Sequence, residues 1–254
     1  MTALALPAFD DNYFWALRSR SGAVVFDPGD AAVVMGYLHE SAQSLYAVLV
    51  THHHWDHIDG IAPLKEQFPD VRVIGPKDAR ITGVTEFVAE GDSVDLSSEL
   101  RFDVMETPGH TLSHISYVRR GELFCGDTMF SLGCGRLFEG SPAQMLHSLD
   151  RLAALDDETK MHCSHEYTLA NARFAINVDP HNAELKAYIT AVRLLRDQGL
   201  PSVPTTIKIQ RRCNPFLRVD EPAVIASVER HAGRALTDRT DVFTNLRLWK
   251  DSFR

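Results

Sequence analysis

The sequence predicts an α/β domain followed by a mostly helical domain. Strand and helix patterns alternate along the first two-thirds of the chain, and helical periodicity dominates the last third. Histidines and aspartates gather where predicted strands end, which is where α/β proteins place functional groups. We therefore expect an α/β domain over residues 1–168 and a mostly helical domain over residues 169–254.

The predicted elements follow from short apolar or alternating runs and from longer runs with helical spacing. Strands are expected over residues 13–19, 22–29, 45–50, 71–76, 100–109, 113–120, 122–127 and 160–164. Helices are expected over residues 31–42, 58–68, 142–155, 169–178, 182–198, 222–231 and 238–249. A stretch rich in Thr, Ile and Arg, residues 204–216, is expected to be extended.

Composition narrows the class of protein. The 254 residues carry a net charge of −8, which gives no general attraction to nucleic acid or to an anionic membrane. No apolar run reaches the roughly 18 residues of a membrane helix. The start of the sequence has no basic segment and carries Pro7, so we expect no signal peptide. Four cysteines without C-x-x-C spacing indicate reduced thiols and a cytoplasmic protein.

One predicted strand runs into a dense polar cluster, T-H-H-H-W-D-H-I-D-G. Residues two apart on an extended backbone point the same way, so His52 and His54 can bind one ion. Asp56 and His57 follow where the chain turns into a helix, within reach of a second ion. Trp55, like the neighbouring His53 and Asp59, is interpreted as a packing, loop or surface residue. H-x-H-x-D-H therefore predicts two ligand pairs.

Three more candidate ligands stand at predicted strand ends. His110 lies in T-P-G-H-T, Asp127 in F-C-G-D-T and His165 in C-S-H-E-Y-T. Imidazole and carboxylate suit zinc, iron or manganese. A structural zinc site usually closes four ligands around one ion and favours cysteine, whereas here ligands are in surplus and no cysteine pair exists. Donor number and type therefore predict a catalytic site with two metal ions.

Other residues of the same types have simpler interpretations. Asp27 in F-D-P-G is either a partner of a ligand histidine or an Asx-turn residue, and the sequence favours neither. Cys125 is interpreted as a small buried residue. The remaining histidines are interpreted as ordinary surface or core residues: His39, His114, His147, His162, His181 and His231.

The blocks T-H-H-H-W-D-H, T-P-G-H-T, C-G-D-T and H-E-Y-T resemble the metallo-β-lactamase superfamily. P-A-F-D-D-N-Y-F-W-A-L, G-C-G-R-L-F-E-G, N-P-F-L-R and L-R-L-W-K-D resemble, within it, glyoxalase II, the hydroxyacylglutathione hydrolases, across nearly the whole chain. The resemblance implies an αβ/βα sandwich with a binuclear site at one edge. It also implies that residues 1–168 are catalytic and that the helical residues 169–254 help to bind glutathione.

The resemblance assigns the candidate ligands to two divalent ions, zinc first, with iron or manganese as alternatives. One ion would be held by His52, His54 and His110. The other would be held by Asp56, His57 and His165. Both would be bridged by Asp127. The catalytic residues would be Asp56 and Asp127, with a metal-bound hydroxide as the nucleophile. The positions that match glutathione contacts are Arg136, Tyr167, Arg247 and Lys250.

The implied reaction is hydrolysis of the thioester S-D-lactoylglutathione to D-lactate and glutathione, the second step of methylglyoxal detoxification. Water between two such cations has its pKa lowered to about 7, and the leaving thiolate has a pKa of about 8.5, so no strong general acid is required. The alternatives are another thioesterase of this superfamily, or an iron persulfide dioxygenase acting on a glutathione conjugate. A metal-dependent binding module without turnover is the alternative outside enzymes.

Glutathione is a net anion, so an acidic protein needs local positive charge to bind it. Arg136, Arg247, Lys250 and Arg254 supply such charge, and we expect a monomer with a small-molecule substrate. Without the resemblance, Arg247 and Lys250 would be interpreted as a solvated helix face and Tyr167 as a core aromatic. The sequence departs from the family at Phe138, where some relatives have tyrosine, and at Ser113, where glycine is common.

Overall fold

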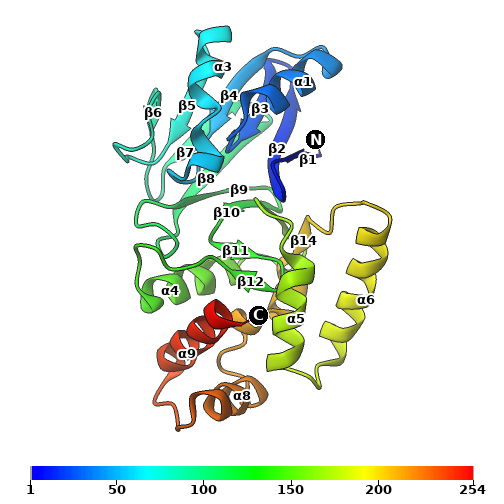
Figure 1. The fold of residues 1–254 in the computed structure, drawn as a ribbon. Helices are drawn as coiled ribbons and strands as arrows, with labels where there is room; N and C mark the ends of the chain where they lie inside the picture. The colour runs from blue at the N-terminus through cyan, green and yellow to red at the C-terminus, as the bar shows by residue number, and fades with distance from the viewer. Residues whose placement is uncertain (1, 254) are drawn as a thin grey trace. The chain divides into compact units, whose positions relative to one another are not determined.

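The structure is a computed structural model that describes residues 2–253 (Figure 1). Its contacts divide the chain into two compact units. The first unit comprises Met1–Glu106 and Ser113–Gly126, and the second comprises Thr107–Leu112 and Asp127–Arg254. The domain boundary expected after residue 168 stays a prediction.

The first unit begins with a six-stranded sheet in the order β1-β2-β3-β4-β5-β6. The pairs β1–β2 and β2–β3 are antiparallel, and the pairs β3–β4, β4–β5 and β5–β6 are parallel. Its strands are β1 (Leu4–Ala8), β2 (Asn12–Ser19), β3 (Gly22–Phe26), β4 (Leu45–Leu49), β5 (Arg72–Gly75) and β6 (Glu86–Phe87). Strands β1 and β6 were not expected from the sequence.

Two helices, α1 (Ala31–Ser41) and α3 (Ile61–Gln67), cover one face of this sheet (Figure 1). Val34 of α1 and Leu64 of α3 are fully buried against strand residues. The helix expected over residues 58–68 is α3, which begins at Ile61, and a separate short helix, α2 (Trp55–Ile58), precedes it and ends before Gly60. A side chain at Gly60 would meet the Pro28 carbonyl at 2.4 Å, so only glycine allows this close approach.

The other face of the first sheet packs on four antiparallel strands of the same unit. These are β7 (Ser93–Ser97), β8 (Leu100–Glu106), β9 (Ile115–Arg119) and β10 (Glu122–Gly126). Aromatic rings fill the space between the two layers: Phe26 stacks on Phe124 with centroids 3.9 Å apart, and Phe102 meets Phe26 edge-on at 5.6 Å. Burial of these rings is the main apolar contribution to this core.

The second unit combines two small antiparallel pairings with the remaining helices. The strands are β11 (Met129–Phe130), β12 (Gly133–Cys134), β13 (Lys160–Cys163) and β14 (Thr205–Thr206). The helices are α4 (Pro142–Ala153), α5 (Thr168–Val178), α6 (Ala183–Asp197), α7 (Ile207–Cys213), the 3-10 helix η1 (Pro215–Leu217), α8 (Pro222–Ala232) and α9 (Arg239–Ser252). Five of these helices lie within a few residues of their expected bounds: α4, α5, α6, α8 and α9.

The expectation of an extended segment over residues 204–216 is wrong, because α7 occupies most of it. The Thr206 hydroxyl caps this helix by accepting a hydrogen bond from the Ile209 amide at 3.3 Å. Ile207, Gln210 and Cys213 are buried at helical spacing. Tertiary burial thus outweighs the strand preference of threonine and isoleucine. Among the described residues, no helix has both the length and the apolar character to cross a membrane.

Candidate metal centre

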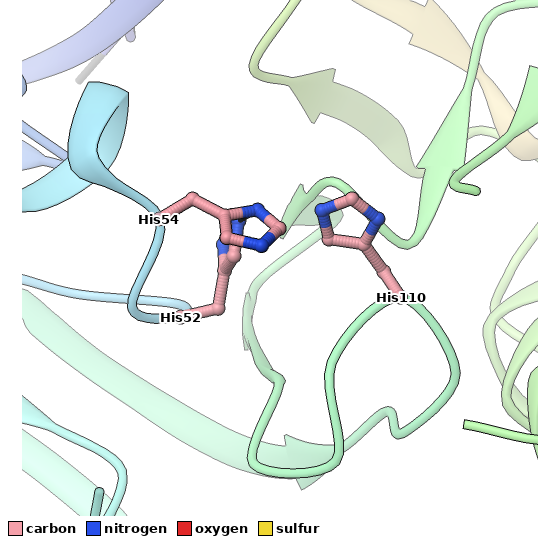
Figure 2. Close-up of side chains that lie close together, drawn as sticks. All are labelled: His52, His54 and His110. Carbon is pink, nitrogen blue, oxygen red and sulfur yellow. Dashed lines mark hydrogen bonds between the residues drawn. The ribbon is translucent and has the colours of Figure 1, made fainter. Parts of the chain in front are cut away.

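His52 and His54 leave the end of β4 with their rings next to each other (Figure 2). The Nε2 atom of His52 lies 3.1 Å from the Nδ1 atom of His54, and the Nδ1 atom of His52 lies 3.0 Å from the Thr51 hydroxyl. His53 instead faces Asp78, at 3.6 Å. The alternation expected for extended backbone therefore holds, and two imidazole nitrogens converge on one point.

Asp56 and His57 form the second pair of the first unit, on α2. The Nε2 atom of His57 lies 3.4 Å from the Asp56 carboxylate, and its Nδ1 atom lies 3.2 Å from Asp27. The Asn12 amide donates a hydrogen bond to Asp56 at 3.0 Å. Both members of the pair are thus held from behind by residues of other segments, as metal ligands usually are.

Asp27 is the partner of His57, one of the candidate ligands. Its carboxylate accepts hydrogen bonds from the Thr51 amide at 2.7 Å and the Thr51 hydroxyl at 2.8 Å, in addition to its contact with His57. The side chain is buried and the backbone has a φ of 49°, which is unfavourable for aspartate. Asp27 therefore connects Thr51 with His57, the last residue of H-x-H-x-D-H. We call this segment, residues 52–57, the ligand motif.

His114 is a residue that the sequence interpretation missed. Its ring is fully buried and stacks on the ring of His52, with centroids 4.8 Å apart. Gly126 lies close by with a φ of 48°, and a side chain there would meet the Thr51 hydroxyl at 2.4 Å and His114 at 2.8 Å. The spacing of His114 four residues after His110, just before a strand, was the available indication.

The second unit supplies His110, drawn in Figure 2, together with Asp127 and His165. His110 lies in the loop after β8. The Nε2 atoms of His110 and His165 lie 3.5 Å and 3.4 Å from the same Asp127 oxygen. The Nδ1 atom of His110 lies 2.9 Å from the Arg136 carbonyl, and His165 stacks on Tyr167 at 4.7 Å. Each imidazole therefore turns its Nε2 atom toward Asp127.

These donors fit divalent metal ions. They are imidazole nitrogens and carboxylate oxygens, the ligand types of zinc, iron and manganese sites. The second ring nitrogen of His52, His57 and His110 is in each case next to an oxygen, which fixes the ring and leaves the first nitrogen to face other donors. The cluster of His and Asp side chains thus has the chemistry of a metal centre.

A second feature of the second unit is a group of cations around Lys250. Burial and the positive charges of Arg247, Arg173 and Arg136 lower the pKa of Lys250. The Lys250 ammonium also lies 5.5 Å from the ring centre of Phe174. Arg173 was not singled out from the sequence. Three arginines close enough to lower the pKa of one lysine favour binding of an anion there.

Arg247 differs from its three neighbours in that it is only 5% exposed. Its guanidinium donates hydrogen bonds to the Cys134 carbonyl at 2.9 Å and to Asp251 at 2.8 Å, and it lies 5.0 Å from the Phe216 ring. A solvated helix face is therefore ruled out for Arg247. Arg136 is well exposed, with Asp251 at 3.6 Å. Arg254, expected to add charge here, lies outside the described residues.

Comparison with known proteins matches both parts of the chain. Residues 9–165 match the Metallo-beta-lactamase superfamily, and residues 166–253 match the Hydroxyacylglutathione hydrolase C-terminus. The hydroxyacylglutathione hydrolase of Photobacterium profundum is 48% identical over 255 aligned positions, and that of Xanthomonas campestris is 49% identical. Both alignments cover 100% of this chain and 100% of the relative.

Solved structures share the fold. ETHE1 from Myxococcus xanthus aligns with a TM-score of 0.67 and 25% identity, over 97% of this chain and 90% of that chain. The BLEG-1 B3 metallo-beta-lactamase aligns with a TM-score of 0.62 and 23% identity, over 85% of this chain and 98% of that chain. The expected α/β fold of the metallo-β-lactamase type, followed by a helical segment, is confirmed.

Fold and donor set together define a metallo-hydrolase of the metallo-β-lactamase superfamily. The matches that cover the whole length of the chain narrow this class further. The chain belongs to the hydroxyacylglutathione hydrolase, or glyoxalase II, family.

Proposed function

We propose that this chain hydrolyses 2-hydroxyacyl thioesters of glutathione, with S-D-lactoylglutathione as the first substrate to test. The products are D-lactate and glutathione. The observation that carries this proposal is the presence, in one chain, of a His/Asp donor set and a cation group. The donor set suits hydrolysis, and the cation group suits an anionic substrate such as a glutathione thioester.

Two divalent ions are part of the proposal, zinc first and iron or manganese as alternatives. One is assigned to His52, His54 and His110. The other is assigned to Asp56, His57 and His165. The bridging ligand is assigned to Asp127. All seven are His or Asp side chains able to hold an ion. Ions held by these residues would supply a hydroxide near neutral pH and would stabilise negative charge on the thioester oxygen.

Residues of this chain hold the proposed ligands in position, and the reaction itself requires no strong general acid. Asn12 and Asp27 hold Asp56 and His57 in place from behind. The leaving group is a thiolate, whose ordinary pKa of about 8.5 lets it depart without protonation by a buried acid. An iron dioxygenase with a single ion would not need Asp56 and His57 as ligands. The contacts that hold Asp56 and His57 in place therefore support a hydrolase with two ions over a dioxygenase with one.

Glutathione binding is assigned to the second unit, to Arg136, Tyr167, Arg247 and Lys250. Lys250 is assigned the main contact with the negative charge of the substrate, because its ammonium is half-buried among other cations. The Arg247 guanidinium already donates hydrogen bonds to Cys134 and Asp251, so its contribution is to hold the loop that carries Arg136. Tyr167 stacks on His165 and links the two functions of this unit.

The cellular setting completes the proposal. None of the four cysteines forms a disulfide and all are buried, which suits a reducing cytoplasm and a monomer without intermolecular disulfides. The substrate is a small molecule, and the acidic chain is assigned no nucleic-acid or membrane partner.

The test is hydrolysis of S-D-lactoylglutathione, followed by loss of the thioester absorbance, after reconstitution with zinc, iron or manganese. Absence of turnover after reconstitution with each of the three metals would remove the proposal. Lys250→Ala should raise KM several-fold with kcat nearly unchanged, because it removes binding of the non-reacting part of the substrate. Lys186→Ala, an exposed lysine on α6, is the matched control and should leave KM unchanged.

Metal stoichiometry is a separate test. Protein prepared without chelators should hold about two ions per chain, and His57→Ala should lower this number while His39→Ala should not. His39 is a matched control because it lies in the last turn of α1 and is not among the proposed ligands. Fewer than one ion per chain in carefully prepared wild-type protein would contradict the binuclear assignment.

A further inference from the structure

Two large aromatic side chains are exposed beside the ligand motif of the first unit. Trp55 is 61% exposed and Phe9 is 47% exposed. Their rings meet edge-on with centroids 5.2 Å apart, and Phe9 also contacts the buried Phe14 ring at 6.0 Å. Exposed aromatic rings that pack on each other present an apolar surface to solvent, which usually has a binding role.

The position of this pair is fixed by the ligand motif itself. Trp55 lies between His54 and Asp56 in the chain and begins α2. Phe9 lies in the turn between β1 and β2, and Asn12, the first residue of β2, donates a hydrogen bond to Asp56. The same turn therefore supports one proposed ligand and carries the aromatic ring that contacts Trp55.

Phe9 adopts an unfavourable backbone conformation to reach this position. Its φ is 49°, a left-handed value that bulky side chains rarely take and that glycine or asparagine would tolerate better. Such strain persists when surrounding contacts enforce it, and it often marks a functional residue. Here the ring contacts with Phe14 and Trp55 accompany the strain.

We infer that Phe9 and Trp55 form an apolar wall that receives the acyl side chain of the thioester and so sets acyl selectivity. The inference rests on the proposed function. A glutathione thioester has an anionic part, which the cations of the second unit suit. The acyl side chain is its apolar part. The reacting carbonyl must reach the ligand motif, and Trp55 is part of that motif, so the group attached to the carbonyl comes next to this wall.

The first experiment compares two thioesters that differ in acyl side chain. S-mandeloylglutathione carries a phenyl group where S-D-lactoylglutathione carries a methyl group. Phe9→Ala and Trp55→Ala should each lower the kcat/KM ratio of the mandeloyl over the lactoyl thioester about 3- to 10-fold, the worth of one aromatic contact. Phe87→Ala is the matched control, because Phe87 is an equally exposed aromatic, at 59%, on β6. That variant should keep the wild-type ratio.

The second experiment needs no turnover. Calorimetry gives the affinities of S-hexylglutathione and S-methylglutathione, whose alkyl groups take the place of the acyl group. The advantage of the hexyl over the methyl compound should shrink about 3- to 10-fold in Phe9→Ala, with Phe87→Ala as control. Because Phe9 is not a residue of the ligand motif, this variant decides the matter even if Trp55→Ala loses metal.

The outcomes separate the wall from the function. A wild-type protein that hydrolyses neither thioester overturns the proposed function, while calorimetry still tests the wall. An active wild type whose Phe9→Ala variant keeps both the kcat/KM ratio and the hexyl advantage overturns the wall. An equal loss for both thioesters also overturns it, since a merely structural role would weaken both alike.

Discussion

Asp27→Asn should separate the stability of the first unit from its affinity for metal. The carboxylate accepts hydrogen bonds from the Thr51 amide and hydroxyl and contacts His57 with the same oxygen that takes the hydroxyl. An amide of the same shape keeps one acceptor oxygen and replaces the other by a donor. In either orientation one buried N–H group then faces another donor, at Thr51 or at His57.

The magnitudes follow from these contacts. Asp27→Ala removes the acceptor for two buried Thr51 donors at about 1–3 kcal/mol each, so unfolding free energy should fall by about 2–6 kcal/mol. Asp27→Asn loses part of this, about 1–2 kcal/mol. Its metal affinity should fall about 10- to 100-fold, because His57 loses the acceptor that orients its ring.

Urea unfolding of metal-free protein measures the first effect, and competition with a coloured chelator measures the second. Asp30→Ala is the matched control. Its side chain caps α1 by accepting a hydrogen bond from the Ala32 amide at 2.8 Å, so it should cost about 1 kcal/mol and leave metal affinity unchanged. Wild-type metal affinity in Asp27→Asn would refute the role assigned to Asp27.

Three further predictions concern other contacts. Asn12→Leu should weaken metal binding about 10-fold in chelator competition, because Asp56 then loses the amide that donates a hydrogen bond to it at 3.0 Å, and unchanged binding would contradict this. Hydrogen bonds from Arg80 hold the pKa of Asp78 well below its usual range, so the stability Asp78 contributes is present above its unfolded pKa of about 4 and is lost as pH falls. In urea unfolding of metal-free protein, the difference in unfolding free energy between wild type and Asp78→Asn should therefore shrink below about pH 4. A difference that stays constant with pH would contradict this prediction. Burial raises the pKa of Cys163 to about 12, so this thiol should resist a disulfide reagent in native protein and react after unfolding in guanidinium, and rapid native labelling would exclude this.

The ligand motif was predictable because its geometry is local. Residues two apart on a strand share a face, so the pairing of His52 with His54 and the separation of His53 follow from spacing alone. Asn12 could not be found this way. Its partner Asp56 is 44 residues further along the chain, and the contact depends on how β2 sits in the sheet.

Residue types with two ordinary uses were the next limit. Asp27 before Pro28 is equally good as a turn residue and as an acceptor, and only the fold brings Thr51 and His57 to it. His114 has the same difficulty, since a buried histidine beside a strand is usual and its stacking on His52 depends on the tertiary structure. The segment that forms α7 misled for the opposite reason, because its local composition favours a strand.

Arg247 and Lys250 show that two cations close together in the sequence can have different roles in the folded protein. The sequence interpretation gave Arg247 and Lys250, three residues apart, the same role, and both lie on α9. The fold then gives them different work: it buries the Arg247 guanidinium against the Cys134 carbonyl and leaves Lys250 half-buried with a lowered pKa. Removing Arg247 therefore leaves a buried carbonyl without its donor, which costs stability as well as charge. Substrate affinity alone is tested more cleanly at Lys250, and the two substitutions should not be treated as equivalent.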